Sequence, residues 1–385
     1  MVRRRGLTAL IFAGATAVIF GVAYATQRLV VTGIPDSALA TPRLSEAVSP
    51  HASPGAFPTQ WAGPSELPSS PRPSVGRSTL QRPKPLQSIT IAAVGDMNPS
   101  GNTSRSSPSG KNASAIAAGL SDGTLAAFLG LGDFQYSTGT CSALVGEWGK
   151  LWGPVISKTY HIAGPSHDAA SETNELGYRK FFAGQCPGSS TKSAAVTRRG
   201  SSIGPFEPYS FDLGTWHFAM MPTAALRYET RSAESLADWL DRDLTSARRA
   251  GKHLAVAYHD PYFTSRTDEH DRETKVKPWI DVIDKNEVRL TLSGSQHNYE
   301  RSCPVRADDR CTAASGRGVT AFQVSTGGIG LRKFKDSPDY IVKRFDDTHG
   351  WLKLTLNSDG SFSWRFMPVD GDGTDSGSRT ARPAG

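Results

Sequence analysis

The chain has 385 residues, of which 38% are hydrophobic, so it is long enough for one large or two medium-sized domains with a buried core. Its formal net charge is +7, but residues 1–86 hold nine Lys and Arg against three Asp and Glu, which leaves +1 for residues 87–385. This nearly neutral body contains no basic run interleaved with aromatic residues, which argues against nucleic acid as a partner.

Residues 1–33 have the features of an export signal or a membrane anchor. Arginines at positions 3–5 precede the apolar run LTALIFAGATAVIFGVAYA, residues 7–25, whose last three residues form the small-x-small pattern of a signal-peptidase site. The run also approaches the ~20 residues needed to span a bilayer. A cleaved signal peptide and an uncleaved anchor are both consistent with this pattern. Either would place the rest of the chain outside the cytoplasm, secreted or anchored, with membrane contact only through this segment.

Residues 34–86 are predicted to form a disordered spacer. They contain eleven of the 25 prolines, together with Ser, Ala and Gly, and offer few aromatic or β-branched side chains to bury. At the other end, residues 370–385 are polar and rich in glycine, and they are predicted to be a flexible tail. The segment between them, residues 87–369, is the predicted folded domain.

Strand-like apolar runs recur along this domain, and an Asp or a His follows the end of each. In chain order these residues are Asp96, Asp133, His167, His259 and His297. The carboxyl ends of strands form the rim at which α/β sheets bind ligands, so we expect these five side chains to share one crevice.

Helices and hairpins are predicted between these runs. SAESLADWLDRDLTSARRA has Leu236, Leu240 and Leu244 at i, i+4 spacing, which is typical of an amphipathic helix. NASAIAAGL predicts a shorter helix. PYSFDLGTWHFAMM and GWLKLTLNSDGSFSWRFMP predict hairpins that turn at residues 213–214 and 359–360. Together these elements predict a two-sheet α/β sandwich.

Four cysteines, an even number in a chain expected to be exported, favour two disulfides. Cys303 and Cys311 flank a short polar loop and are the first expected pair. Cys141 and Cys186 would then form the second.

Carboxylates and imidazoles on five separate loops indicate a metal site rather than a nucleophile triad. Carboxylates and a phenolate suit Fe(III), and imidazole suits zinc, iron or manganese. Here the sequence resembles the calcineurin-like metallophosphoesterases and, within them, exported enzymes similar to purple acid phosphatases. The matching blocks are VGDMN, GLGDFQY, GPSHD, AYHDPYF and GSQHNYER, in the order of the family. GDFQY, which matches GDxxY, and HNYER, which matches HxYER, are the most specific.

The resemblance implies a four-layer α/β/β/α sandwich of two mixed sheets that binds one or two metal ions. The first ion, most readily iron, would be held by Asp96, Asp133, Tyr136 and His297. Many calcineurin-like enzymes have D-x-H in the first block, but the third position here is Asn98.

The second ion, which could be zinc, manganese or iron, would share Asp133 and bind His259. Two further ligands of this site are replaced in the chain. Ser166 stands where GNHD has its asparagine, and Ser295 stands where GHxH has its first histidine. A serine hydroxyl is short and neutral, so the second site is expected to be weak.

The resemblance implies hydrolysis of a phosphomonoester by a metal-bound hydroxide, with His167 as general acid or hydrogen-bond donor. The substrate would be a small phosphate ester or a phosphorylated molecule. Two alternatives are a mononuclear site with altered activity and an inactive relative that serves as an extracytoplasmic binding or scaffold domain.

Tyr299, Glu300 and Arg301 are open to two interpretations: residues that orient His297, or an ordinary buried ion pair that holds the loop. The other histidines match no ligand block and are interpreted as structural or surface residues. They are His51, His161, His217, His253, His270 and His349.

Overall fold

The computed structural model describes residues 86–381 except for positions 137, 173–175 and 313–316. The predicted signal or anchor segment, and the predicted linker up to residue 85, lie outside the described residues. Within the described part of the chain, no helix is long and apolar enough to cross a membrane.

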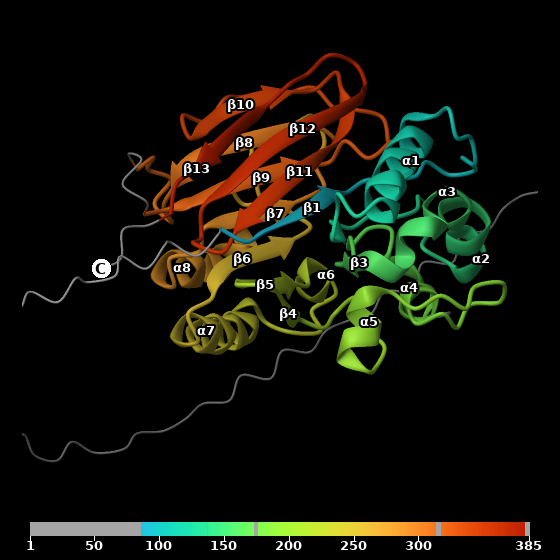
Figure 1. Cartoon of the computed structure of the whole chain (residues 1–385), viewed down its shortest axis with the longest axis horizontal. Coiled ribbons are helices and arrows are strands. Elements are labelled where there is room, and N and C mark those ends of the chain that lie inside the picture. Colours follow the sequence, from blue (N-terminus) through green and yellow to red (C-terminus); the bar gives the residue numbers. More distant parts are fainter. Residues whose placement is uncertain (1–85, 137, 173–175, 313–316, 382–385) are drawn as a thin grey trace, which may run out of the picture. The chain divides into compact units, whose positions relative to one another are not determined.

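Two mixed sheets form the centre of the domain (Figure 1). The first has six strands in the order β13-β12-β11-β1-β2-β3, with β1 parallel to β2 and antiparallel to β11. Its strands are β1 (Ser88–Val94), β2 (Ala127–Gly130), β3 (Thr159–His161), β11 (His349–Asn357), β12 (Phe362–Asp370) and β13 (Ser376–Arg379).

The second sheet has seven strands in the order β10-β8-β9-β7-β6-β5-β4. Strands β5, β6, β7 and β9 are parallel, and β4, β8 and β10 pair antiparallel with their neighbours. The bounds are β4 (Tyr209–Leu213), β5 (Trp216–Met221), β6 (His253–Tyr258), β7 (Leu290–Ser293), β8 (Tyr299–Val305), β9 (Val319–Val324) and β10 (Ile341–Phe345).

Helices lie on the outer side of each sheet (Figure 1). The six-stranded side carries α1 (Pro108–Ser121), α2 (Cys141–Ala143), a π-helical turn (Leu144–Trp148), α3 (Gly149–Trp152), α4 (Gly177–Phe182) and α5 (Ala194–Arg199). The seven-stranded side carries α6 (Thr223–Arg227), α7 (Ala233–Arg249) and α8 (Lys277–Lys285). Short 3-10 turns occupy Gly153–Lys158, Ala169–Ser171 and Thr274–Val276.

Two hydrophobic cores hold these layers together. One joins the facing sides of the two sheets and the helices α1 to α5, and the other lies between the seven-stranded sheet and helices α7 and α8. The predicted leucine stripe of α7 faces this second core, with Leu236, Leu240 and Leu244 buried. The predicted four-layer α/β/β/α sandwich is confirmed, as are both predicted hairpins, β4–β5 and β11–β12.

The C-terminal segment differs from the prediction of a flexible tail. Residues Ser376–Arg379 form strand β13, which pairs with β12, and Asp375 just before it is buried. The segment is ordered mainly by polar contacts, because the Asp375 carboxylate accepts hydrogen bonds from Tyr299 and Arg301. A composition rule that looks for apolar residues has no means of detecting this kind of burial.

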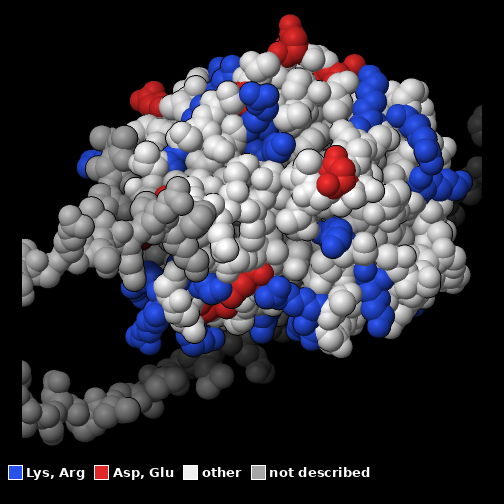
Figure 2. Space-filling model, in the orientation of Figure 1, with Lys and Arg blue, Asp and Glu red and all other residues white. Residues whose placement is uncertain are grey.

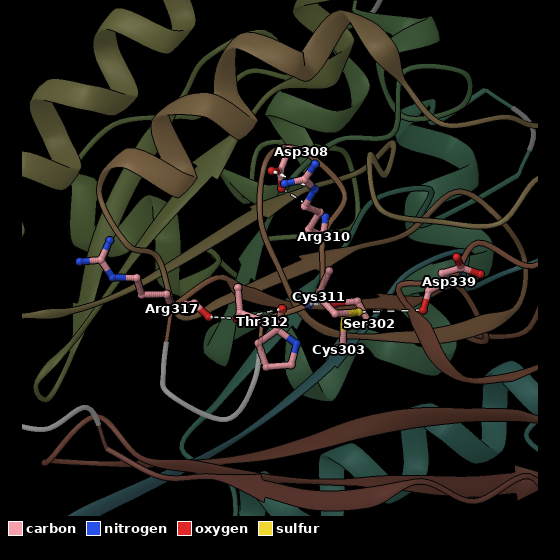
Figure 3. The surroundings of a disulfide bond; sticks show 10 residues. Ser302, Cys303, Asp308, Arg310, Cys311, Thr312, Arg317 and Asp339 are labelled. Atoms are coloured by element: carbon pink, nitrogen blue, oxygen red, sulfur yellow. Dashed lines mark hydrogen bonds and ion pairs between the residues drawn. A yellow bond between two sulfur atoms is a disulfide. The ribbon is translucent and has the colours of Figure 1, made fainter.

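Both predicted disulfides are present. Cys141 is bonded to Cys186, and Cys303 is bonded to Cys311. Figure 3 shows the second bond at the base of the short loop that carries Asp308 and Arg310, whose side chains form an exposed ion pair. Two such bonds suit a domain that folds in an oxidising compartment.

Charged side chains of both signs are interspersed on the face of the domain seen in Figure 2, and a large part of this face is uncharged. Lys and Arg cover more of this face than Asp and Glu do, although the net charge of residues 87–385 is small. The expectation that nucleic acid is not a partner stays a prediction.

Candidate metal centre

The predicted site residues meet where the carboxyl ends of parallel strands from the two sheets lie close together. Asp96 and Asp133 follow strands β1 and β2 of the six-stranded sheet, and His259 and His297 follow strands β6 and β7 of the seven-stranded sheet. Backbone hydrogen bonds link successive loops, from Asp96 N to Gly132 O at 3.0 Å and from Gly294 N to His259 O at 2.9 Å. The side chains that follow the strand ends therefore lie close together, and their role as a metal site stays a prediction.

Three buried side chains form a group that could hold a metal ion. One ligand atom each from Asp96, Asp133 and His259 lies within 4.8 Å of the others. Among the described residues, Asp133 Oδ1 is buried without a hydrogen-bond partner. A buried carboxylate oxygen without a donor is costly unless a cation satisfies it, so the residues present fit a metal ion at this position.

The hydroxyl of Tyr136 lies among the ligands of the predicted first site. It is 2.9 Å from Asp96 Oδ1, 3.1 Å from Asp133 Oδ2 and 2.9 Å from His297 Nε2. Because a phenol has a single proton, three acceptor-capable neighbours at these distances exceed what it can satisfy by donation. The geometry brings together all four residues that the sequence assigned to the first metal.

Backbone carbonyls fix the orientation of both histidines that are predicted to be ligands. The Nδ1 atom of His259 is 2.7 Å from Leu131 O, and the Nδ1 atom of His297 is 3.1 Å from Gly330 O. A carbonyl only accepts, so Nδ1 carries the proton and the Nε2 lone pair is directed towards the carboxylates. The Nε2 atoms lie 3.5 Å from Asp133 Oδ2 and 3.4 Å from Asp96 Oδ1, respectively. This is the arrangement in which histidine binds metals.

The pKa shifts of the cluster reflect burial and close opposite charges. Burial would raise the pKa of Asp96, but the His297 hydrogen bond and the nearby His259 hold it well below its usual range. Burial would lower the pKa of His259, but the Asp133 carboxylate raises it well above the ordinary value. Burial, Asp133 and Asp96 all raise the pKa of Tyr136. The two carboxylates therefore make the cluster a site for positive charge.

Backbone strain is concentrated at these loops. Four residues other than glycine have a positive φ here: Asp96 at 57°, Asp133 at 50°, Ser295 at 82° and His297 at 55°. Such conformations cost roughly 1–3 kcal/mol each and cluster at functional sites, where the surrounding structure imposes them. These loop conformations accompany the close approach of Asp96, Asp133 and His297.

Two glycines allow the loops to approach one another. A Cβ atom at Gly164 would lie 1.7 Å from Asp133 Oδ1, and a Cβ atom at Gly132 would lie 2.3 Å from His259 Nδ1. Gly132 also has a φ of +92°, which few other residues adopt. Side chains at these positions would occupy the space that the ligands need.

The two replaced ligands of the second site contribute no side chain to the cluster. Ser166 is exposed. The Ser295 hydroxyl donates to Asp260 Oδ1 at 3.1 Å, while the Ser295 backbone N–H donates to Asp96 Oδ2 at 2.9 Å. Ser295 thus orients a ligand of the first site through its backbone, and Asp133 and His259 are the residues of the predicted second site that remain in place.

His167 lies at the opening of the cluster. Its Nε2 atom is 3.9 Å from Asp133 Oδ2, its ring centre is 4.0 Å from that of Tyr136, and its side chain is 26% exposed. It can therefore reach both the buried carboxylate and a ligand that enters from solvent.

The interpretation in which Tyr299, Glu300 and Arg301 orient His297 is not supported by their contacts. Glu300 accepts hydrogen bonds from Thr264 and Ser265, and the other two bind Asp375. The structure favours the alternative, in which these side chains hold the β8 strand and its loop in place. The carbonyl of Gly330 orients His297 instead.

Asp168 is a structural element of the site that motif matching left without a role. It is fully buried, and its two oxygens accept from Phe134 N at 3.0 Å and Gly164 N at 2.9 Å. It therefore joins the loop of Asp133 to the loop of His167. In the sequence, the position of Asp168 directly after His167 was the signal that could have indicated its role.

Asn98 and the histidines outside the ligand blocks have structural contacts. Asn98 Oδ1 accepts from Asn102 and Ser109, in a polar network of its own loop. The buried His161 contacts Tyr178 and Ser193. His217 lies between Asp212 and Asp243, His253 contacts Ser358 O, and His349 contacts Ile329 O. His270 is closer to the site than expected, with its ring centre 6.4 Å from that of His297, and His51 lies outside the described residues.

Comparison with known proteins gives the same class of fold. No protein-family model matches the chain. A purple acid phosphatase from yellow lupin seeds superposes with a TM-score of 0.58 at 19% identity, covering 77% of this chain and 54% of that one. GAP50 of Plasmodium superposes with a TM-score of 0.56 at 13% identity, covering 77% of this chain and 90% of that one. The fold is therefore that of the calcineurin-like metallophosphoesterases.

Sequence relatives point to one branch of this class. "Probable inactive purple acid phosphatase 1" of Arabidopsis thaliana is 28% identical over 166 residues, which cover 38% of this chain and 26% of that protein. "Probable inactive purple acid phosphatase 9" of the same plant is 25% identical over 197 residues, covering 46% and 29%. The matched region thus spans less than a third of either relative. The resemblance to purple acid phosphatases that the motifs indicated is confirmed.

Proposed function

We propose that this chain is an exported, metal-dependent phosphoesterase that hydrolyses phosphomonoesters. The observation that supports it most directly is the buried Asp133 Oδ1 atom, which has no hydrogen-bond partner among the described residues and lies beside Asp96 and His259. A cation at this position would satisfy it. The strained loops and the oriented imidazoles are consistent with such an ion.

The chain offers a strong and a weak position for metal. Asp96, Asp133, Tyr136 and His297 would hold the first ion, and this donor set of carboxylates and a phenolate favours iron. A second ion, of zinc, manganese or iron, would have Asp133 and His259. When bound, a metal ion supplies a Lewis acid that polarises the phosphoryl group and activates water.

The protein's own residues would orient the substrate and move a proton. His167 is placed at the opening, where its Nε2 atom can donate a proton to the leaving alkoxide. The ester P–O bond would break as the water oxygen forms the new P–O bond. The proton from His167 would leave with the alcohol product, and the attacking water would release one of its protons to solvent, from which His167 is reprotonated. Asp168 would hold the loop of His167 in place beside the loop of Asp133, because its carboxylate accepts two backbone hydrogen bonds.

A second candidate is a binding or scaffold domain without catalytic activity. The replaced second-site positions support it, because Ser166 is exposed and the Ser295 hydroxyl binds Asp260. Both curated relatives are named as probable inactive enzymes, and the structure of GAP50 is described as that of an anchor in an inner membrane complex.

Metal content per chain separates these candidates. The full-length protein, produced under oxidising conditions and supplied with iron, zinc and manganese, should retain about one metal ion per chain after dialysis. Asp133→Asn should lose most of it, and Ser166→Ala, at an exposed position, should not. Retained metal together with hydrolysis of p-nitrophenyl phosphate supports the enzyme. Retained metal without hydrolysis of any phosphomonoester supports the binding domain, and a chain that binds no metal refutes the phosphoesterase.

Export rests on the sequence of residues 1–33 and on the two disulfides. Protein from its native host should begin near Thr26 if the segment is cleaved, or should remain with the membrane fraction and face outward if it is not. A cytoplasmic pool with an intact N-terminus would contradict both versions.

A further inference from the structure

The segment 329–332 lies against the predicted first metal site. Ile329 N donates to Asp96 O at 3.3 Å, Gly330 O accepts from His297 Nδ1 at 3.1 Å, and Arg332 N donates to His297 O at 2.9 Å. Two ligands are thus held by this segment. The position of Arg332 is therefore fixed relative to the centre by its own backbone.

The guanidinium of Arg332 reaches the loop where the second site has lost a ligand. Its Nη1 atom is 3.4 Å from Ser295 O, and its Nη2 atom is 2.6 Å from Glu269 Oε2. The Arg332 side chain is 19% exposed, whereas the Glu269 side chain is 63% exposed. A largely buried cation is therefore paired with a carboxylate that reaches in from solvent.

We propose that Arg332 binds the phosphoryl group of the substrate and supplies positive charge beside Ser295, where a ligand of the second metal is replaced. This inference rests on the proposed phosphoesterase function. A phosphomonoester is a dianion, and a centre with one firmly held metal ion offers less positive charge than a centre with two. A guanidinium stays charged at all relevant pH values, and its planar array of donors matches two phosphoryl oxygens.

Glu269 would occupy this binding position until substrate arrives. The Glu269 carboxylate in its ion pair with Arg332 is exposed to solvent. Exposed ion pairs contribute little to the free energy of folding. A phosphoryl group with two negative charges can therefore displace the single carboxylate. Glu269 then acts as a competitor of the substrate, and its removal should strengthen binding.

The alternative is that Arg332 only braces two loops. The same pair of loops has a second ion pair, Lys335 Nζ to Asp268 Oδ1 at 2.6 Å, and a β-bridge between Thr267 and Phe334. Lys335 is therefore a matched control, because it contacts Asp268 and Arg266 of the neighbouring loop. If Arg332 only braces the loops, the loss of Lys335 and the loss of Arg332 should change phosphate affinity by similar amounts.

The test is calorimetric titration of the full-length protein with inorganic phosphate, with metal content measured on the same samples. Arg332→Gln should weaken phosphate binding roughly ten- to hundred-fold, as expected for the loss of charge-assisted hydrogen bonds. Arg332→Lys should restore part of the affinity. Glu269→Gln should bind phosphate more tightly than the unaltered protein, and Lys335→Gln should bind it equally well.

Three results would overturn the proposal: Arg332→Gln with unchanged phosphate affinity, Glu269→Gln and Arg332→Gln both weakening it, or Lys335→Gln weakening it as much as Arg332→Gln. Failure of the proposed function is recognised separately, because it shows as absence of metal from every variant or as retained metal without hydrolysis of any phosphomonoester. Phosphate affinity of the metal-free protein then still reports on Arg332. In hydrolysis, Arg332→Gln should raise KM more than it lowers kcat.

Discussion

Replacing Asp375 by Asn should destabilise the domain substantially, although Asp375 lies in a segment whose composition is that of a flexible tail. The Asp375 side chain is 4% exposed. It accepts hydrogen bonds from Arg301 Nε at 2.7 Å and Nη2 at 3.1 Å, from Tyr299 Oη at 2.8 Å and from Trp364 Nε1 at 3.1 Å. Asn keeps the shape of the side chain but removes the charge that neutralises Arg301.

The loss of stability depends on how well water can solvate the Arg301 guanidinium once the Asp375 charge is removed. Removing one partner of a buried ion pair costs about 3–5 kcal/mol. The Arg301 side chain is 17% exposed, so water offsets part of the loss and we expect about 3 kcal/mol. A loss of this size should lower the Tm by roughly 5–10 °C.

Equilibrium unfolding in urea, monitored by tryptophan fluorescence without reductant, would measure this free energy. Asp372→Asn is the control, because Asp372 is exposed in the same segment and should change stability by less than about 0.5 kcal/mol. The double variant Arg301→Gln/Asp375→Asn should be more stable than the sum of the two single losses predicts, because neither charge is then left alone. Equal stability of Asp375→Asn and the unaltered protein would refute the argument.

Three further predictions concern the site and its surroundings. Gly164→Ala should abolish metal binding, because its Cβ atom would lie 1.7 Å from Asp133 Oδ1, whereas Gly153→Ala, with no atom within 4 Å, should retain it; elemental analysis distinguishes them. Burial lowers the pKa of His161 to about 3, below the ~6.5 of an unfolded chain, so its contribution to stability is present above pH 6.5 and is lost as the pH falls towards 3. About 2 kcal/mol should be lost from this source by pH 5, and His161→Gln should show a pH dependence smaller by that amount; equal pH dependence in urea unfolding would contradict the assignment. Tyr136→Phe should remove the visible charge-transfer band of iron-loaded protein while the other three ligands retain metal, and a band of unchanged intensity would exclude Tyr136 as a ligand.

Local sequence patterns were sufficient to predict the fold and which side chains meet at the candidate site. Asp96, Asp133, His259 and His297 each follow a short apolar run, and such a run determines both the strand and the place where the chain leaves the sheet. The hairpins were predictable for the same reason, because their turns and strands are contiguous. The two disulfides followed from an even cysteine count and one short loop.

The remaining features depend on contacts between distant segments. Arg332 contacts the loop of Ser295 because residues 329–332 pack against the loop of His297, and no local pattern encodes that meeting. Glu300 belongs to the matched block HNYER, yet it binds Thr264 and Ser265 and has a structural role. Two of the partners that order Asp375, Tyr299 and Arg301, lie more than 70 residues earlier in the chain, and the composition of the segment around Asp375 gives no sign of them.

The pairing of β1 with β11 determines when the domain can be completed during synthesis. Ser88 is opposite Asn357, so the first strand of the six-stranded sheet acquires its antiparallel neighbour only when almost the whole chain has left the ribosome. Until then one edge of β1 lacks its native partner, and unpaired edges invite association with other chains. Contacts of such long range also slow folding, which keeps a growing polypeptide unfolded for longer. Newly made chains should therefore depend on chaperones for longer than a domain whose sheets close in the order in which their strands are made.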